Sequence, residues 1–131
     1  MDEEPAQRHP PLAGVVGPCC AGKTTLVNSL TPLGIGARVI AQEHSFAPRM
    51  WQIITRPVWL IYLDVSYSVA QERRWMVWTP ADLEAQHHRL RHAREHCHLY
   101  LATDGLTPAE VLDQTLEFLA SHVTPPASPV V

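Results

Sequence analysis

Short apolar runs alternate along the chain with longer stretches in which apolar residues recur at helical spacing. Apolar runs at 12–16, 37–41, 58–64 and 97–103 have the length and flanking residues of β-strands. The third run, VWLIYLD, is almost continuously apolar, which is typical of a parallel strand covered on both faces. The alternation predicts an α/β fold with a small, mostly parallel sheet of about four strands flanked by helices.

The segments between these runs carry helix signals. A first helix is expected to open after Gly22 and to stop before Pro32. Residues 68–75 and 80–96 are also expected to be helical. The last helix should begin at Pro108, because a threonine precedes this proline as a cap and a glutamate stands at the third helical position.

The two ends of the chain differ in composition from its middle. Residues 1–11 and 124–131 are rich in proline and poor in large apolar residues, so we expect a flexible leader and a flexible tail. Residues 12–123 have no internal repeat and no Gly/Ser tract. With 46% hydrophobic and 18% charged residues, the sequence predicts one domain around one core.

Charge and cysteine content narrow the class of protein. The formal net charge is −3, which argues against a protein that coats nucleic acid. Its three cysteines, Cys19, Cys20 and Cys97, do not form the even framework of a small secreted fold. Neither a signal-peptide pattern nor an apolar run of membrane-spanning length occurs. We therefore expect a cytoplasmic protein with no membrane or nucleic-acid partner.

The turn after the first expected strand carries the strongest chemical signal. Its sequence fits the pattern G-x-x-x-x-G-K-[ST] and consists of Gly17, Pro18, Cys19, Cys20, Ala21, Gly22, Lys23 and Thr24. Such a loop points backbone N–H groups at a bound triphosphate, and the following helix adds the positive end of its dipole. Glycines at both ends let the backbone turn and approach the phosphates. These residues, with Thr25, are therefore expected to bind a nucleotide.

Three side chains at the end of this loop have distinct expected roles. Lys23 would bridge the β- and γ-phosphates, the Thr24 hydroxyl would bind Mg²⁺, and Thr25 would lie toward the α-phosphate. The side chains of Cys19 and Cys20 are not required by this chemistry. We expect them to fill space, the alternative being a thiol of low pKa that oxidises and blocks the nucleotide.

This loop resembles the Walker A motif of the P-loop NTPases. Residues 61–66 and 69–74 resemble the strand, turn and helix that lead into the arginine-bearing lid of small P-loop nucleotide and metabolite kinases. Residues 98–111 resemble the last strand and helix of the same kinases. The resemblance spans residues 12–123 and implies a three-layer P-loop fold. Because no N-K-x-D guanine signature occurs, ATP is the favoured nucleotide.

A phosphoryl-transfer enzyme needs cations close to the transferring charge. Arg73 and Arg74 fall in the segment that would form a lid and are the expected catalytic cations, together with Lys23. Three later arginines, at positions 89, 91 and 94, are more typical of a solvated helix face. Arg49 and Arg56 are weaker candidates for contacts with an acceptor.

The carboxylate that would organise Mg²⁺ has two candidates. Asp64 ends the third apolar run and would either hold the metal or cap the following helix. Glu43 lies beyond the second strand, at the end of the sheet where ligands bind, and would hold Mg²⁺ or a substrate hydroxyl, the alternative being an acid on the protein surface. His44 beside it is a candidate general base. The related kinases have five core strands, and only four are found here.

We expect the clustered histidines and tryptophans to have structural roles and no role in the chemistry. His88, His92 and His96 are spaced to share one helix face, which we expect to be polar and not a metal site. Residues 75–78, WMVW, are expected to pack in the core or against a homodimer partner. The alternative is that they cover the nucleotide.

The sequence favours a kinase-like phosphotransferase that uses ATP and Mg²⁺ to act on a small-molecule or nucleotide acceptor. The alternative is a nucleotide-binding regulatory or interaction module, or a slow NTPase. Residues 42–57 are few for an acceptor-binding subdomain, which is why this alternative stays open.

Overall fold

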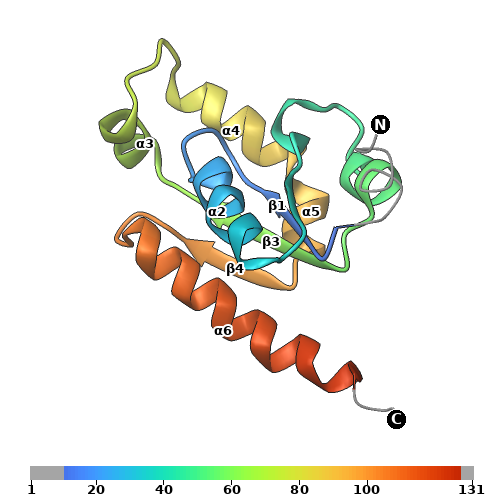
Figure 1. The fold of residues 1–131 in the computed structure, drawn as a ribbon. Coiled ribbons are helices and arrows are strands. Elements are labelled where there is room, and N and C mark those ends of the chain that lie inside the picture. The colour runs from blue at the N-terminus through green and yellow to red at the C-terminus, as the bar shows by residue number, and fades with distance from the viewer. Residues whose placement is uncertain (1–10, 128–131) are drawn as a thin grey trace, which may run out of the picture.

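Four parallel strands form the centre of the molecule (Figure 1). The structure, a computed structural model, describes the backbone of residues 11–127 and the side chains of residues 11–122. The strands are β1 (Ala13–Val16), β2 (Ala37–Val39), β3 (Trp59–Asp64) and β4 (Leu99–Ala102), in the order β2-β1-β3-β4. Every neighbouring pair is parallel. The α/β class, the four strands and the parallel sheet are therefore confirmed.

Helices and short helical turns connect the strands. The α-helices are α2 (Lys23–Leu30), α3 (Tyr67–Arg73), α4 (Pro80–Arg89), α5 (Arg91–His96) and α6 (Pro108–Ala127). Two 3₁₀ turns, η1 (Thr31–Leu33) and η2 (Gln42–His44), flank β2, and one π-helical turn, η3 (Trp51–Thr55), precedes β3. The first helix starts after Gly22 and the last at Pro108, as the sequence predicts.

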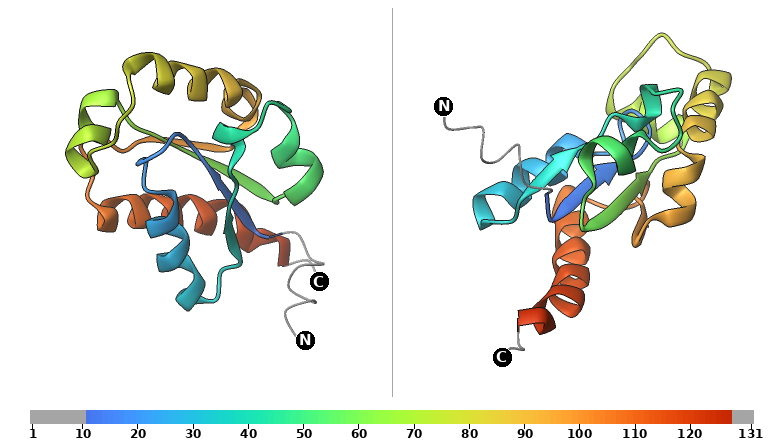
Figure 2. Two further views of the ribbon diagram at one scale, coloured as in Figure 1. Left: turned by 90° about the horizontal axis from the view of Figure 1, so that it is seen from above. Right: turned by 90° about the vertical axis from the view of Figure 1, so that its right-hand side faces the viewer.

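Helices cover both faces of the sheet, because alternate residues of each strand point to opposite sides. On one face, Val15 and Ile61 pack in a cluster with buried residues of α2 and α6, such as Leu26 and Val111. On the other face, Tyr62 packs in a cluster that η3 and α5 help to form. Figure 2 shows the two helical layers on opposite sides of the strands.

One predicted helix is divided in two. Residues 80–96 form α4 and α5, which are separated at Leu90, where φ is −94° and ψ is 2°. Leu90 is fully buried, and so is Ala93 in the next helix. Both residues belong to the buried cluster on the side of the sheet that also contains Tyr62. The second predicted helix also ends earlier, at Arg73 instead of residue 75.

The ends of the chain lie partly beyond the described residues. Of the expected leader, residues 1–10 are outside the described part, and of the expected tail, residues 128–131 are outside it. Helix α6 continues to Ala127, past the expected domain boundary at 123. Within residues 11–127, no helix has the length and apolar character needed to cross a membrane.

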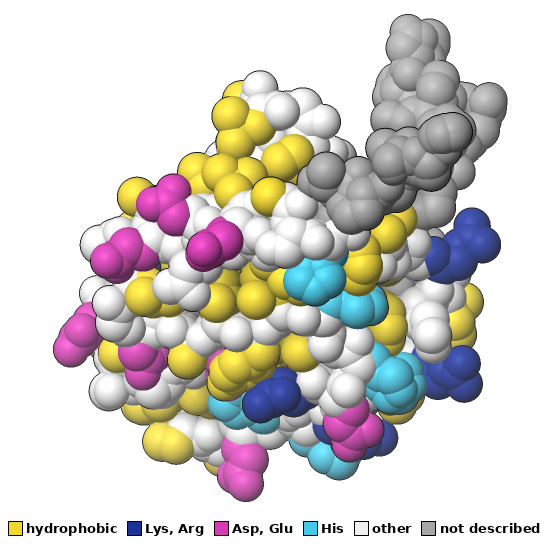
Figure 3. Space-filling model, turned by 90° about the horizontal axis from the view of Figure 1, so that it is seen from below, with side chains coloured by type: hydrophobic (Ala, Val, Ile, Leu, Met, Phe, Trp, Pro, Cys, Tyr) yellow, Lys and Arg dark blue, Asp and Glu magenta, His cyan; other side chains and the backbone are white. Residues whose placement is uncertain are grey.

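Charged side chains of both signs lie on the face seen in Figure 3. Most acidic side chains lie on the left of this view, whereas histidines and the Lys and Arg side chains gather toward the lower right, with an acidic side chain among them. The view therefore presents a mixed surface and not a single basic field.

The strand order places one loop at a special position. From β1 the chain moves to β2 on one side and then returns to β3 on the other side of β1. In open parallel sheets, ligands bind beyond the carboxyl ends of the strands where the connections diverge in this way. The loop of residues 17–22 leaves β1 at this position.

Candidate functional site

The loop after β1 is folded tightly against the sheet. Gly17 has φ 152°, and a Cβ atom there would lie 2.0 Å from the backbone oxygen of Leu63 in β3. Cys20 and Gly22 also have positive φ, at 69° and 102°. A chain without the two glycines could not follow this path without strain.

The loop ends in an unpaired helix N-terminus. Gly22 is the N-terminal cap residue of α2, no side chain caps the helix, and its first turn contains no acidic residue. The amides of Lys23, Thr24 and Thr25 have no hydrogen-bond partner in the described part of the chain. Because the first amides of a helix carry its partial positive charge, this end of α2 can bind an anion.

Lys23 is buried beneath the loop and is fully engaged. Its Nζ donates to the backbone oxygens of Gly17 at 2.8 Å and Pro18 at 3.0 Å. It also forms an ion pair with Glu43 Oε2 at 3.1 Å. The second carboxylate oxygen of Glu43, Oε1, is buried without a partner in the described structure. Such an orphaned oxygen is costly and marks a group that can bind something further.

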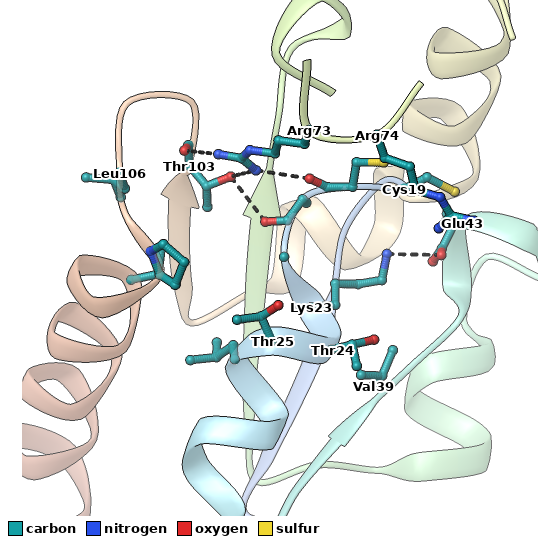
Figure 4. Close-up of a pocket in the computed structure, with 16 residues that line it drawn as sticks. Cys19, Lys23, Thr24, Thr25, Val39, Glu43, Arg73, Arg74, Thr103 and Leu106 are labelled. Carbon is teal, nitrogen blue, oxygen red and sulfur yellow. Dashed lines mark hydrogen bonds and ion pairs between the residues drawn. The ribbon is translucent and has the colours of Figure 1, made fainter. Parts of the chain in front are cut away.

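A cavity of about 660 Å³ lies above this loop and brings most of the predicted site together (Figure 4). Its wall contains all residues from 19 to 26, and also Val39, Glu43, Arg73, Arg74, Thr103, Leu106, Pro108 and Val111. Glu43 and Leu106 lie at opposite ends in Figure 4, with Lys23 between them. Gly17 and Pro18 are not part of the wall, and they act instead through their bonds to Lys23.

Arg73 joins the loop to the end of β4. Its Nη1 donates to the backbone oxygen of Cys20 at 3.0 Å and to Thr103 Oγ1 at 2.9 Å, and its Nη2 donates to the backbone oxygen of Thr103. Thr103 Oγ1 also lies 3.1 Å from the backbone oxygen of Ala21. Sequence reasoning missed Thr103, although a polar residue just beyond a parallel strand is a usable signal.

Arg74 lines the same cavity but, unlike Arg73, makes no bond through its guanidinium to a described residue. It is exposed, and its guanidinium has no hydrogen bond or ion pair among the described residues. The two adjacent arginines therefore differ, since Arg73 holds the protein together and Arg74 is available to a ligand.

Asp64 is not brought to the cavity. Its Oδ1 accepts from the Val65 amide at 2.9 Å and lies 2.9 Å from His87 Nε2. Its Oδ2 accepts from the Tyr100 hydroxyl at 2.6 Å. Burial, and secondly this hydrogen bond, raise the pKa of Tyr100 to about 12. The carboxylate of Asp64 is thus used within the protein.

The N-terminus of helix α3 is capped by Ser66. Ser66, not Asp64, is the cap residue, and its Oγ accepts from the Val69 amide at 3.3 Å. A serine side chain reaches the amide three residues ahead in the usual capping geometry. The interpretation of Asp64 as the helix cap is therefore wrong.

Cys19 lies next to polar side chains from two other parts of the chain, α4 and η2. Its amide donates to Gln86 Oε1 at 2.9 Å, and Gln86 Nε2 donates to Cys19 Sγ at 3.3 Å. His44 Nε2 lies 3.9 Å from Cys19 Sγ and 3.6 Å from Glu43 Oε2. Sequence reasoning missed Gln86, which is buried at 7% exposure on α4.

The neighbouring thiol has a different environment. Burial raises the pKa of Cys20, and the nearby Cys19 raises it further, although Arg74, Lys23 and Arg73 act in the opposite direction. Its Sγ contacts Met76 Sδ at 4.0 Å. The alternative of a low-pKa thiol is therefore wrong for Cys20.

The remaining candidates lie away from the cavity. His92 Nδ1 accepts a hydrogen bond from Trp51 Nε1 at 3.1 Å. The His92 ring stacks on the His96 ring, with centroids 4.1 Å apart. Among the described residues, the three helical histidines form no cluster able to hold a metal. Arg49 lines a separate hollow of about 490 Å³.

The apolar segment 75–78 is only partly packed. Trp75 is 74% exposed and Val77 is 88% exposed, so the expected core packing is wrong for these two residues. Trp78 packs against the core cluster, and its ring centroid lies 5.8 Å from that of Tyr67.

Comparisons with known proteins leave the geometry of the site as the basis for its function. The chain matches no known protein family, and no curated protein matches it in sequence.

Proposed function

We propose that this protein binds ATP with Mg²⁺ in the 660 Å³ cavity and belongs to the three-layer P-loop fold. One observation carries the proposal: eight consecutive residues, 19–26, from the loop and the start of α2, line one cavity together with three further charged side chains, Glu43, Arg73 and Arg74. A triphosphate needs many donors that converge from one side, and a loop leading into a helix N-terminus supplies them. The volume is that of a typical small-ligand site.

The two ends of the cavity suit the two ends of a nucleotide. Lys23 and the unpaired amides of α2 form the cationic end, where phosphates would bind. Leu106 lies at the end of the cavity opposite Glu43 (Figure 4), and Pro108 and Val111, which follow it in the chain, add apolar surface to the wall, which suits a planar base. This orientation of the nucleotide is inferred only from where charged and apolar side chains line the cavity.

Lys23 would exchange partners when the nucleotide binds. Its three present acceptors are the oxygens of Gly17, Pro18 and Glu43. Phosphate oxygens would replace the Glu43 carboxylate as its charged partner. Glu43 would then be free to bind another cation. In this proposal the Glu43 carboxylate takes the position beside Lys23 that a phosphate would occupy.

The donor set fits Mg²⁺ at Thr24 and Glu43. Both residues line the cavity, and Glu43 has one buried oxygen without a partner. Hydroxyl and carboxylate oxygens are the ligands that Mg²⁺ prefers. Asp64 does not line the cavity, so we assign the metal role to Glu43 and not to Asp64. When bound, the ion neutralises charge on the β- and γ-phosphates.

The reaction we propose is phosphoryl transfer to a small hydroxyl-bearing acceptor. The acceptor oxygen forms a bond to the γ-phosphorus, the bond to the bridging oxygen breaks, and ADP leaves. The acceptor's proton passes to a base, for which the exposed imidazole of His44 is the candidate. Lys23 and Arg74 stabilise the charge on the transferring group, and Arg73 holds the loop in position.

One observation favours the second candidate, a binding module without efficient transfer. Between β2 and β3 the chain forms only η2 and η3 as regular structure. Gln42, which is fully buried, fixes this segment by accepting from the Trp51 amide at 2.9 Å and donating to the Ala47 oxygen at 2.8 Å. A short, fixed segment leaves little chain with which to enclose an acceptor.

Equilibrium binding of ATP, in the presence and absence of Mg²⁺, tests the proposal. We expect Mg²⁺-dependent binding that weakens about ten- to a hundredfold in Lys23→Ala, because a charge-assisted hydrogen bond is lost. An unchanged affinity in this variant would overturn the nucleotide site. Transfer of label from γ-labelled ATP to a panel of nucleosides and small metabolites then separates the two candidates, since stoichiometric binding without transfer indicates the binding module.

A further inference from the structure

Cys19, Glu43 and His44 form a cluster that phosphate binding does not explain. One ligand atom from each residue lies within 4.8 Å of the others, and they are the only such group in the described part of the chain. Cys19 comes from the loop after β1, and the other two come from η2 after β2. A phosphate-binding loop acts through backbone amides, so no side chain at position 19 is needed for a phosphate.

We propose that these three side chains bind a thiophilic divalent cation of the Zn²⁺ class. A tetrahedral zinc ion with bonds of about 2.3 Å to sulfur and about 2.0 Å to nitrogen holds those two atoms about 3.5 Å apart. The observed separation of Cys19 Sγ and His44 Nε2 is 3.9 Å. The nitrogen to carboxylate separation, 3.6 Å, needs a still smaller contraction.

The buried carboxylate supplies a second, independent indication. The side chain of Glu43 is only 6% exposed, yet its Oε1 has no partner among the described residues. The oxygen of Glu43 that lies near His44 is Oε2, which also pairs with Lys23. Rotation of the carboxylate toward the cation would present the unpaired Oε1 to it. When Glu43 turns to the ion, Lys23 keeps two of its three acceptors, the oxygens of Gly17 and Pro18, and loses its charged partner.

The surroundings of the thiol resemble those of a metal ligand. Gln86 holds Cys19 from both sides, by accepting from its amide and by donating to its sulfur. Partners of this kind fix the orientation of metal ligands in proteins. Thiolate and imidazole select Zn²⁺ and related ions over Mg²⁺, which prefers oxygen. Binding releases the thiol proton to solvent, and three protein ligands leave one position for water.

The cation site has a consequence for the nucleotide site, and this consequence rests on the proposed function. Glu43 is the carboxylate that we assign to Mg²⁺, so it cannot serve both ions in the same molecule. A thiophilic cation and Mg²⁺–ATP therefore compete, and the Zn²⁺-bound form is the inhibited form of the protein.

Co²⁺ is a suitable probe because its bond to a thiolate gives a charge-transfer absorption that zinc lacks. The full chain, reduced with a phosphine, is titrated with Co²⁺ alone, and Zn²⁺ is then added. We expect the thiolate band in the natural protein and in Cys97→Ser, the control for a half-buried cysteine elsewhere. The band should vanish in Cys19→Ser and on addition of Zn²⁺.

Three outcomes of the Co²⁺ titration would contradict the cation site. Absence of the band in the natural protein, its survival in Cys19→Ser, or its loss in Cys97→Ser each removes the proposal. His44→Ala adds a variant that does not depend on packing, because this side chain is 60% exposed. It should fold normally by circular dichroism and bind Co²⁺ at least about tenfold more weakly.

Competition with the nucleotide is measured separately. Saturating Mg²⁺–ATP should weaken Co²⁺ binding in the natural protein, and an unchanged Co²⁺ affinity on a nucleotide-loaded protein would overturn the competition. If the protein binds no ATP while the Co²⁺ band follows the expected pattern, the proposed function fails and the cation site stands.

Discussion

The Nζ of Lys23 lies 3.1 Å from Glu43 Oε2, and both side chains are more than nine-tenths buried. Breaking a buried pair by removing one partner leaves an uncompensated charge and costs about 3–5 kcal/mol. The two residues are separated by β2 in sequence and meet because β2 is the direct neighbour of β1. Their pairing ties the loop to the segment after β2.

Lys23→Met should destabilise the protein by about 3 kcal/mol, because Glu43 is then buried without its cation. The double variant Lys23→Met, Glu43→Gln should recover part of this loss, since no unpaired charge remains. Urea unfolding of the natural protein, both single variants and the double variant measures the coupling free energy. Additive losses in the double variant would show that the pair contributes no coupling.

Gly17→Ala should be strongly destabilising, by at least about 2 kcal/mol, because the new Cβ would meet the Leu63 backbone oxygen at 2.0 Å. Gly105→Ala is the matched control, since a Cβ there meets nothing within 4 Å and its φ is not positive. Urea unfolding of both variants checks the difference. Equal stabilities would contradict the close approach of the loop to β3.

Arg73→Ala and Arg74→Ala should have different effects although the residues are adjacent. Loss of Arg73 removes its bonds to Cys20 and Thr103, so amide hydrogen exchange in the loop should rise. Loss of Arg74 should leave exchange and stability unchanged and lower only the affinity for ATP. A rise in exchange in Arg74→Ala would contradict this division of roles.

Asp64→Asn and Glu43→Gln distinguish the two candidate metal carboxylates. Glu43→Gln should remove most of the Mg²⁺ dependence of ATP binding. Asp64→Asn should keep that dependence, because Asp64 is bonded to His87 and Tyr100 outside the cavity. Titration of ATP affinity against Mg²⁺ concentration measures both effects. The reverse pattern would restore Asp64 as the metal carboxylate.

His98 should make the protein less stable in mild acid. Its Nδ1 accepts from the Leu60 amide at 2.9 Å, which requires the neutral ring, and burial followed by the nearby His122 lowers its pKa from the ordinary 6.5. The unfolded chain then binds the proton more readily, so the free energy of unfolding is fully retained above pH 6.5 and falls as the pH drops below it.

His98→Asn provides the test, because its amide oxygen can accept from the same backbone group without titrating. Urea unfolding between pH 5 and 8, a range of about three units around the histidine pKa, should show a weaker pH dependence than in the natural protein. His88→Asn, on an exposed position of α4, is the control and should keep the natural slope. Identical slopes in all three proteins would exclude the role of His98.

Local patterns were sufficient to predict the elements, because each strand is an apolar run and each helix has its own boundary signals. The loop motif was sufficient to predict seven residues of the cavity wall. The contacts of Thr103 and Gln86 were not predictable, since their partners lie 82 and 67 positions away in the chain. The break at Leu90 also escaped prediction, because no glycine or proline marks it in the sequence.

Arg73 has a consequence for how the two halves of a ligand would bind. By joining Cys20 in the loop to Thr103 just after β4, it connects the wall that we propose for the phosphates with the wall that we propose for the base. Ordering one wall lowers the entropy cost of ordering the other. Adenosine and inorganic triphosphate would therefore bind cooperatively when supplied as separate molecules, each raising the affinity for the other.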